Sequence, residues 1–148
     1  MIDAPALISE LATEYPTSPQ APRALLRKAA LEERTRVRVA DAQLQGQVPA
    51  QLVTYRTFLE RYPDADGAAE ALAELAELYE DLRQYELAAQ SLDTLAQRFP
   101  ANTIDAAWRA GQLFEQRVKN LDAARAAYAR VPESSSRYRD AQRRLAQP

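Results

Sequence analysis

The sequence contains no histidine and no cysteine among its 148 residues. Histidine is the side chain that most often moves protons at neutral pH, and both residues are common ligands of transition metals. Their absence also removes the thiolate as a nucleophile. No glycine-rich phosphate loop and no glycine-flanked serine nucleophile replaces them. These absences argue against an enzyme, and nothing in the sequence calls for a cofactor or a metal ion.

Long apolar runs are also missing. No stretch approaches the roughly 18 to 20 apolar residues that span a bilayer, and the first residues lack the basic region and apolar stretch of a signal peptide. The formal net charge is −2, so bulk charge favours neither nucleic acid nor an anionic membrane surface as a partner. We expect no nucleic-acid binding and no insertion into a membrane.

Helix-forming residues dominate what is present. Only three glycines occur, whereas Ala, Leu, Glu, Gln and Arg are abundant and favour helices. Hydrophobic residues make up 47% and charged residues 27% of the chain, which suits one domain with a core of its own. The composition therefore favours an all-α fold.

The clearest pattern lies between residues 69 and 100, where two apolar stripes with helical spacing follow each other across a short polar break. Such stripes predict two amphipathic helices that form a hairpin. The small Ala76 and Ala88 would allow these helices to approach closely, with Tyr79 beside them. The stripes consist of Leu72, Leu75, Ala76 and Tyr79, and then of Ala88, Leu92 and Leu95.

Four prolines close helices at intervals along the chain. Each follows an apolar or aromatic residue, and proline disfavours a helical conformation in the residue before it. The steps between them are 47, 37 and 32 residues, which is typical of paired helices in units too small to bury their own apolar faces. The boundaries are Tyr15-Pro16, Tyr62-Pro63, Phe99-Pro100 and Val131-Pro132.

These signals predict eight helices and no strand. The helices are expected over residues 6–15, 22–44 and 50–62, as a pair within 69–100, and then over 102–118, 121–131 and 134–145. Asn102 and Asp105 are expected to form a capping box. The first full unit carries about ten extra residues around Arg34 to Gln43, which we expect to lengthen one or both of its helices.

This arrangement resembles the tetratricopeptide repeat over essentially the full length of the chain. The resemblance implies an all-α, right-handed superhelical solenoid of about eight antiparallel helices. A single domain, residues 1–148, would contain units at about 17–63, 64–100 and 101–132, with partial units at 1–16 and 133–148. The partial units suggest a segment of a longer protein.

Two stretches, residues 58–63 and 95–100, are similar to repeats of bacterial envelope proteins. These proteins include the outer-membrane assembly lipoproteins and the periplasmic coordinators of the Tol system. That similarity favours the periplasm or cell envelope over the cytoplasm as the location of this chain.

In the tetratricopeptide family, the first helix of each unit lines a concave groove that holds a peptide or protein segment. The resemblance therefore implies a non-enzymatic protein–protein interaction scaffold, or adaptor. Lys28 and Glu32 replace apolar and aromatic core positions, so the first full unit departs most from the pattern. The implied groove residues are Arg23, Leu26, Ala30 and Arg34, then Glu70, Ala73, Glu77 and Asp81, then Asp105, Trp108, Gln112 and Glu115, and finally Asp140 and Arg143.

Trp108, the only tryptophan, is the expected anchor of this groove. A register that places it in the core would also bury Gln112 and Glu115, and a buried glutamate without a partner is costly. The alternative register has its core at positions 107, 110, 111 and 114 and turns the indole toward the groove. With acidic residues beside it, the indole would suit a peptide in which Lys or Arg flanks an apolar anchor.

Charge is segregated along the chain, with net charges of +4 over residues 22–40, −7 over 60–86 and +5 over 109–144. These complementary blocks leave a second function open, a structural or self-associating repeat module within a larger protein. Other clusters have simpler explanations. The carboxylates of residues 70–81 favour a solvated helix face over a cation site, and residues 64–67 favour a helix cap over the start of a calcium loop. The basic residues 34–38 are expected to be a charged helix surface rather than a phosphate site.

Overall fold

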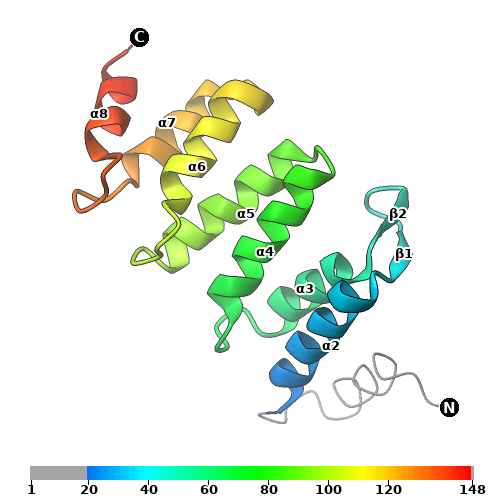
Figure 1. The fold of residues 1–148 in the computed structure, drawn as a ribbon. Helices are drawn as coiled ribbons and strands as arrows, with labels where there is room; N and C mark the ends of the chain where they lie inside the picture. The colour runs from blue at the N-terminus through cyan, green and yellow to red at the C-terminus, as the bar shows by residue number, and fades with distance from the viewer. Residues whose placement is uncertain (1–19, 148) are drawn as a thin grey trace, which may run out of the picture. The chain divides into compact units, whose positions relative to one another are not determined.

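The structure is a computed structural model that describes residues 20–147. In these residues the chain is mostly helical, with seven α-helices, one π-helix and one two-stranded sheet (Figure 1). The expected helical class is confirmed, but the expectation of no strand is wrong, and the first expected helix, residues 6–15, lies outside the described residues. The elements are α2 (Ala21–Thr35), β1 (Arg38–Asp41), β2 (Gly46–Pro49), α3 (Ala50–Arg61), α4 (Ala68–Asp81), α5 (Tyr85–Arg98), α6 (Ala106–Leu113), η1 (Phe114–Val118), α7 (Leu121–Ala129) and α8 (Tyr138–Ala146).

These elements fall in two compact units, divided between Ala71 and Leu72. The first unit contains α2, the two strands, α3 and the beginning of α4, and α2 packs against α3. The second unit contains the rest of α4 and the elements up to α8. In it α5 packs against α6, α6 against α7, and α7 against α8. From α5 onward, each α-helix therefore contacts the next α-helix along the chain.

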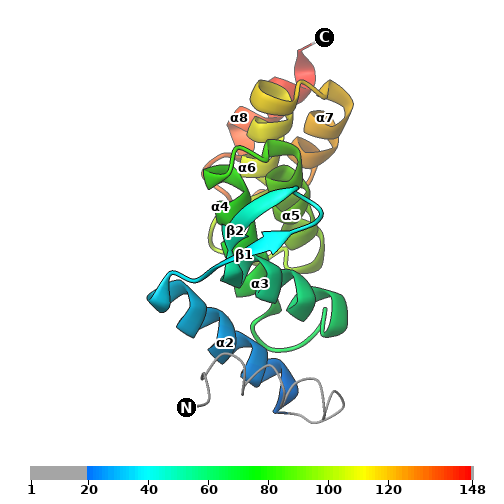
Figure 2. The same ribbon diagram turned by 90° about the vertical axis from the view of Figure 1, so that its right-hand side faces the viewer.

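A β-hairpin follows α2 where a longer helix was expected. Helix α2 ends at Thr35, and Arg36 adopts a left-handed conformation with φ of 55°. Strands β1 and β2 then pair antiparallel, with Val39 opposite Val48 (Figure 2). The expected helix over residues 22–44 is therefore wrong beyond Thr35, and the extra residues lengthen neither helix of this unit.

The local sequence explains why these residues form strands. Valines at 37, 39 and 48 are β-branched, and such residues fit a pleated strand better than a helix. Val48 is buried while its neighbour Gln47 is exposed, the alternation of a strand with one covered face. At the loop, Gln45 takes a positive φ of 54°, and the Leu44 N–H donates to the Asp41 carboxylate at 3.3 Å. Alternation over four residues was too short to compete with the helical pattern before it.

An ion pair holds the hairpin to α3. Arg56 donates from Nη1 and Nη2 to the two carboxylate oxygens of Asp41, at 2.9 and 3.1 Å. The Asp41 side chain is 8% exposed. The hydrogen bond from Arg56 outweighs burial and lowers the pKa of Asp41 below its ordinary value.

The expected core stripes of the central helices are buried. Ala76 in α4 and Ala88 in α5 are both completely buried. The other stripe residues, Leu72, Leu75, Tyr79, Leu92 and Leu95, are buried as well.

The ends of α3 and α5 are built alike. Tyr62, with φ −133° and ψ 59°, follows α3 and donates its backbone N–H to Phe58 O at 2.7 Å. Phe99, with φ −130° and ψ 69°, follows α5 and donates to Leu95 O at 2.8 Å. A proline comes next in both places and cannot continue the helix. The same helix end therefore recurs after 37 residues.

The starts of α4 and α8 are also alike, at a separation of 70 residues. The same two backbone hydrogen bonds precede each helix, and Ala71 and Ala141 are completely buried at equivalent places. The donor and acceptor residues are Ala65 to Tyr62 and Ala68 to Ala65 before α4, and Ser135 to Pro132 and Tyr138 to Ser135 before α8. Two helices that are distant in the sequence therefore begin with one common turn.

The turns that follow α2, α4 and η1 share a residue with positive φ. These residues are Arg36, Arg83 and Lys119, with φ of 55°, 59° and 64°. In each turn the next residue donates its N–H to the carbonyl of a buried residue near the helix end, from Val37 to Glu32, from Gln84 to Tyr79, and from Asn120 to Phe114. The third turn has one residue more than the others, and the wider π-helical turn η1 accommodates it.

The hairpin begins after the turn that follows α2, at the place where α3 would otherwise start. Ala50, the first residue of α3, donates its N–H to Val37 O at 2.9 Å, so the two ends of the hairpin segment meet. Without the twelve residues Arg38–Pro49, the 47 residues from Glu32 to Tyr79 would shorten to 35. A hairpin inserted between α2 and α3 thus explains the extra length of this one step.

Candidate protein-interaction surface

Helix α4 presents a row of exposed carboxylates. Glu70, Glu77 and Asp81 are exposed and Ala73 is half-buried, and their spacing places all four near one side of the helix. The row extends about 16 Å along the helix, at a rise of about 1.5 Å per residue. It comprises the four groove residues that the resemblance implied for this helix.

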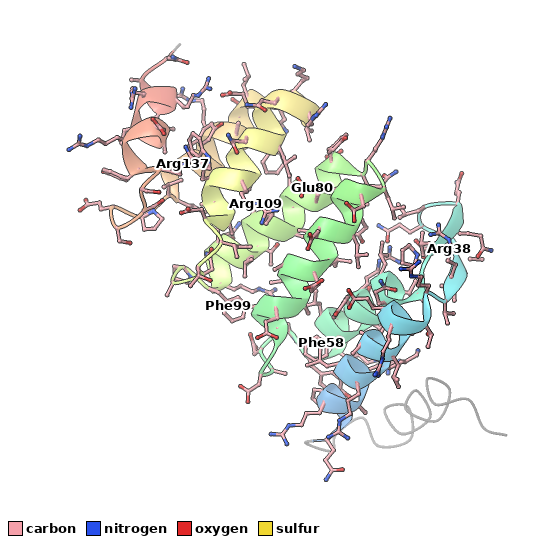
Figure 3. All side chains as sticks on the ribbon, viewed as in Figure 1. Arg38, Phe58, Glu80, Phe99, Arg109 and Arg137 are labelled. Carbon is pink, nitrogen blue, oxygen red and sulfur yellow. The ribbon has the colours of Figure 1, made fainter. Side chains whose placement is uncertain are left out.

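A further ion pair joins α4 to α6 at the solvent. Arg109 Nη2 lies 3.3 Å from Glu80 Oε2, and the two side chains are 37% and 31% exposed (Figure 3). The sequence did not point to either residue, because a pair 29 positions apart leaves no mark on the periodicity of its helices. Helices α4 and α6 therefore meet through charged side chains that are partly open to solvent.

Trp108 lies in the core, so the expectation that it faces a groove is wrong. Its side chain is covered, with 8% of the residue exposed. The centre of the indole lies 5.2 Å from the centre of the Tyr128 ring. The guanidinium of Arg137, which is labelled in Figure 3, lies 5.6 Å from the centre of the indole. The expected core positions 107, 110, 111 and 114 are also buried. The register of α6 was right, but a segment from the C-terminal end of the chain covers the neighbouring face.

Two of the other three residues implied for this part of the groove contact the same C-terminal segment. Asp105 Oδ1 accepts a hydrogen bond from the Ser135 hydroxyl at 2.6 Å. Glu115 pairs with Arg144 at 3.2 Å. Gln112 is half-buried. These contacts leave less of α6 open to a ligand than the resemblance implied.

The remaining implied residues are placed as follows. Asp140, in the first turn of α8, pairs with Arg143 of the same helix at 2.9 Å and with Arg137, directly before the helix, at 3.6 Å. Arg23, Ala30 and Arg34 are exposed on α2, and Leu26 is half-buried there.

The sequence predicted a helix cap at residues 64–67 and a capping box formed by Asn102 and Asp105, and the structure describes both places. Gly67, in the turn before α4, has a positive φ of 91°, and a Cβ there would lie 2.7 Å from the Leu26 side chain. Asn102 Oδ1 accepts the Ala106 N–H at 3.0 Å at the start of α6. The reciprocal half of the expected capping box is not formed, because the Asp105 carboxylate turns to Ser135 instead.

Glu32 occupies the core position that Tyr79 holds in the next unit. Only 5% of Glu32 is exposed, and the Thr54 hydroxyl donates to its Oε1 at 2.5 Å. This partner across the helix pair explains how the first unit tolerates a carboxylate at an aromatic position.

Within residues 20–147, no group of three or more His, Cys, Asp or Glu side chains converges on a possible metal site. In the same part of the chain, no helix has the length and apolarity needed to cross a lipid bilayer. Burial, and to a smaller extent the nearby charge of Glu115, raise the pKa of Tyr128 above its ordinary value. Comparison with protein-family models and with curated proteins finds no match. The surface is therefore interpreted from its own geometry and charge.

Proposed function

We propose that the chain is a non-enzymatic scaffold of tetratricopeptide-like helix pairs that binds a peptide or protein segment. The observation that carries this proposal is the recurrence of one local geometry. The same helix end follows α3 and α5, the same start precedes α4 and α8, and the same turn follows α2, α4 and η1. Units of this kind stack into a solenoid whose first helices share one face.

The charges on the first helices set the chemistry of the partner. Glu70, Glu77 and Asp81 are exposed on α4, and α6 adjoins that helix through Glu80 and Arg109. The partner is a segment with Lys or Arg beside an apolar anchor. Its anchor docks at Ala73, since the buried Trp108 is covered by Arg137.

Nuclear magnetic resonance titration of the whole chain tests this function. The probe is a twelve-residue synthetic peptide with a central leucine flanked by lysines, compared with a peptide in which glutamates replace the lysines. The basic peptide should shift the amide signals of α4 and α6, and the acidic one should not shift them. The variant Glu77→Lys/Asp81→Lys should weaken the basic peptide at least tenfold.

The charge-reversal variant should keep its fold, because basic residues near the end of a helix are favourable. Glu60→Lys is the matched control, since Glu60 is an exposed carboxylate near the end of α3. If basic and acidic peptides shift the same amides, or if Glu60→Lys weakens binding equally, the α4 surface is not the binding face.

Self-association is the second candidate function, and the charge of the C-terminal segment favours it. Residues 137–144 contain four arginines and one aspartate, opposite in sign to the exposed row of α4. A second copy of the chain would then supply the basic partner. Light scattering over a concentration series at low and high salt should show a mass that rises with concentration only at low salt, whereas a constant mass excludes this candidate.

A further inference from the structure

A cavity of about 310 Å³ lies at the base of the β-hairpin, wholly within the first unit. It is bounded by the end of α2, the start of β1, the end of β2 and the first turn of α3. The lining residues are Glu33, Arg36, Val37, Arg38, Pro49 and Gln51. None of them belongs to the surface proposed above, so this cavity is a separate feature of the chain.

Val37 gives the cavity an apolar wall. It is 40% exposed, and Val37 and Leu121 are the two large apolar residues most open to solvent in the described part of the chain. Its backbone is held at both ends, because its N–H donates to Glu32 O at 3.3 Å and its carbonyl accepts the Ala50 N–H at 2.9 Å. The exposed side chain is therefore presented by a fixed backbone rather than by a free loop.

Gln51 contributes a polar side chain to the lining of the cavity. Its Oε1 is buried and accepts no hydrogen bond from the described residues. A buried acceptor without a donor is unfavourable, and most such atoms in proteins are satisfied. Because Gln51 Oε1 is closed to solvent, the contacts offered to a ligand are those of Val37 and the arginines.

The rim of the cavity is basic. Residues 33–38 are all exposed and contain three arginines and one glutamate. Arg38 donates from Nη2 to Gln47 O at 2.8 Å, which orients its guanidinium while leaving other N–H groups of that side chain for a ligand (Figure 3). Of the charged residues in this stretch, Glu33, Arg36 and Arg38 line the cavity, and their net charge is +1 in a chain whose total is −2. Of the stretch expected to be a charged helix surface, Arg34 and Thr35 are exposed on α2, whereas residues 36–38 leave the helix and line the cavity.

We propose that this cavity binds an acidic peptide segment of a partner protein, with one apolar side chain against Val37 and carboxylates on Arg36 and Arg38. A peptide can bring an apolar side chain and carboxylates to this cavity together, whereas a phosphodiester backbone offers no apolar side chain. None of the lining residues is aromatic, so no side chain there can stack a nucleobase.

Fluorescence anisotropy of the whole chain tests the proposal. The probe is a labelled ten-residue peptide with a central leucine flanked on each side by two glutamates. Its affinity should fall at least tenfold when alanine replaces the leucine and again when lysines replace the glutamates. A labelled ten-nucleotide single-stranded DNA should bind more weakly than the acidic peptide, and tighter binding of the DNA would overturn the proposal.

Variants locate the site. Arg36→Gln/Arg38→Gln and, separately, Val37→Glu should each weaken the acidic peptide at least tenfold. The matched control is Arg23→Gln/Arg27→Gln, which removes two exposed arginines from the other end of α2. Circular dichroism checks that every variant keeps its helices. Equal loss with the control pair, or no loss with either cavity variant, would show that the peptide binds elsewhere.

The outcome is independent of the scaffold proposal. Glu77→Lys/Asp81→Lys, which is designed to abolish binding of the basic peptide on α4, should leave the affinity of the acidic peptide within twofold. A large loss with this variant would place both peptides on one surface and would overturn the separate site.

Discussion

Gly111 occupies a position in α6 that leaves no space for a larger side chain. A Cβ there would lie 2.5 Å from two ring atoms of Tyr128, a residue that is almost fully buried. Gly111→Ala should therefore destabilise the chain by about 1–3 kcal/mol through overpacking, although alanine is the better helix former. Urea unfolding followed by circular dichroism measures the change.

Gly46→Ala is the control for that substitution. A Cβ at Gly46 would meet nothing closer than 3.9 Å, so the free energy of unfolding should change by about 0.5 kcal/mol or less. If Gly111→Ala were as stable as the native chain, Tyr128 could not lie against α6 as described.

The environment of Trp108 predicts its fluorescence. An indole covered by Arg137 and in contact with Tyr128 should emit at short wavelength and be poorly quenched by acrylamide. Arg137→Ala should increase the quenching constant, because it removes the guanidinium from the face of the ring. Arg139→Ala removes an exposed neighbour and should leave quenching unchanged. Strong quenching in the native chain would contradict the buried position of Trp108.

At the scale of elements, the hairpin depends on the ion pair between Asp41 and Arg56. Asp41→Asn should lower the free energy of unfolding at pH 7 by about 1.5–3 kcal/mol, the usual contribution of hydrogen bonds to a charged group. A double-mutant cycle with Arg56→Met separates the pair from other losses. A coupling energy near zero would mean that the hairpin is held by its valines rather than by this pair.

The same pair predicts a pH dependence. The pKa of Asp41 is lowered in the folded state, so its contribution to stability is complete above the ordinary pKa of about 3.9 and is lost as pH falls through the lowered folded value. The difference in stability between the native chain and Asp41→Asn should therefore narrow below pH 4. Chemical unfolding at a series of pH values measures it, and a difference that stays constant down to pH 2 would contradict the pKa shift.

The hairpin also marks the limit of what the sequence predicts for single elements. The apolar positions of α4 and α5 recur over several turns, and their burial followed from spacing alone. Helix α2 ends next to Arg36, which has a positive φ. An arginine does not indicate this backbone conformation in a sequence, as a glycine would. The strands are four residues each, too short for a clear alternation. The pairing of the two strands depends on contacts between separate segments, and residues at the ends of both strands line the cavity beside Val37. The cavity could therefore not be predicted from the sequence either.

At the scale of the molecule, the helical class and most helix ends could be predicted because prolines and periodic apolar residues act locally. The burial of Trp108 could not be predicted, because it depends on a contact with Arg137, which lies 29 residues further along the chain. The same holds for Glu80 and Arg109, whose pairing joins two helices. Polar contacts between distant segments decided which implied groove residues remain open, and no periodicity encodes them.

The division into two compact units makes a prediction about cooperativity. Trp108 lies in the second unit, so its fluorescence follows the unfolding of that unit, whereas circular dichroism follows the helices of both. Asp41→Asn should lower the urea midpoint seen by circular dichroism and leave the fluorescence midpoint unchanged within error. Gly111→Ala should lower the fluorescence midpoint. If both probes shifted together for both variants, unfolding would be a single transition, and α4, which contributes residues to each unit, would be the element that couples them.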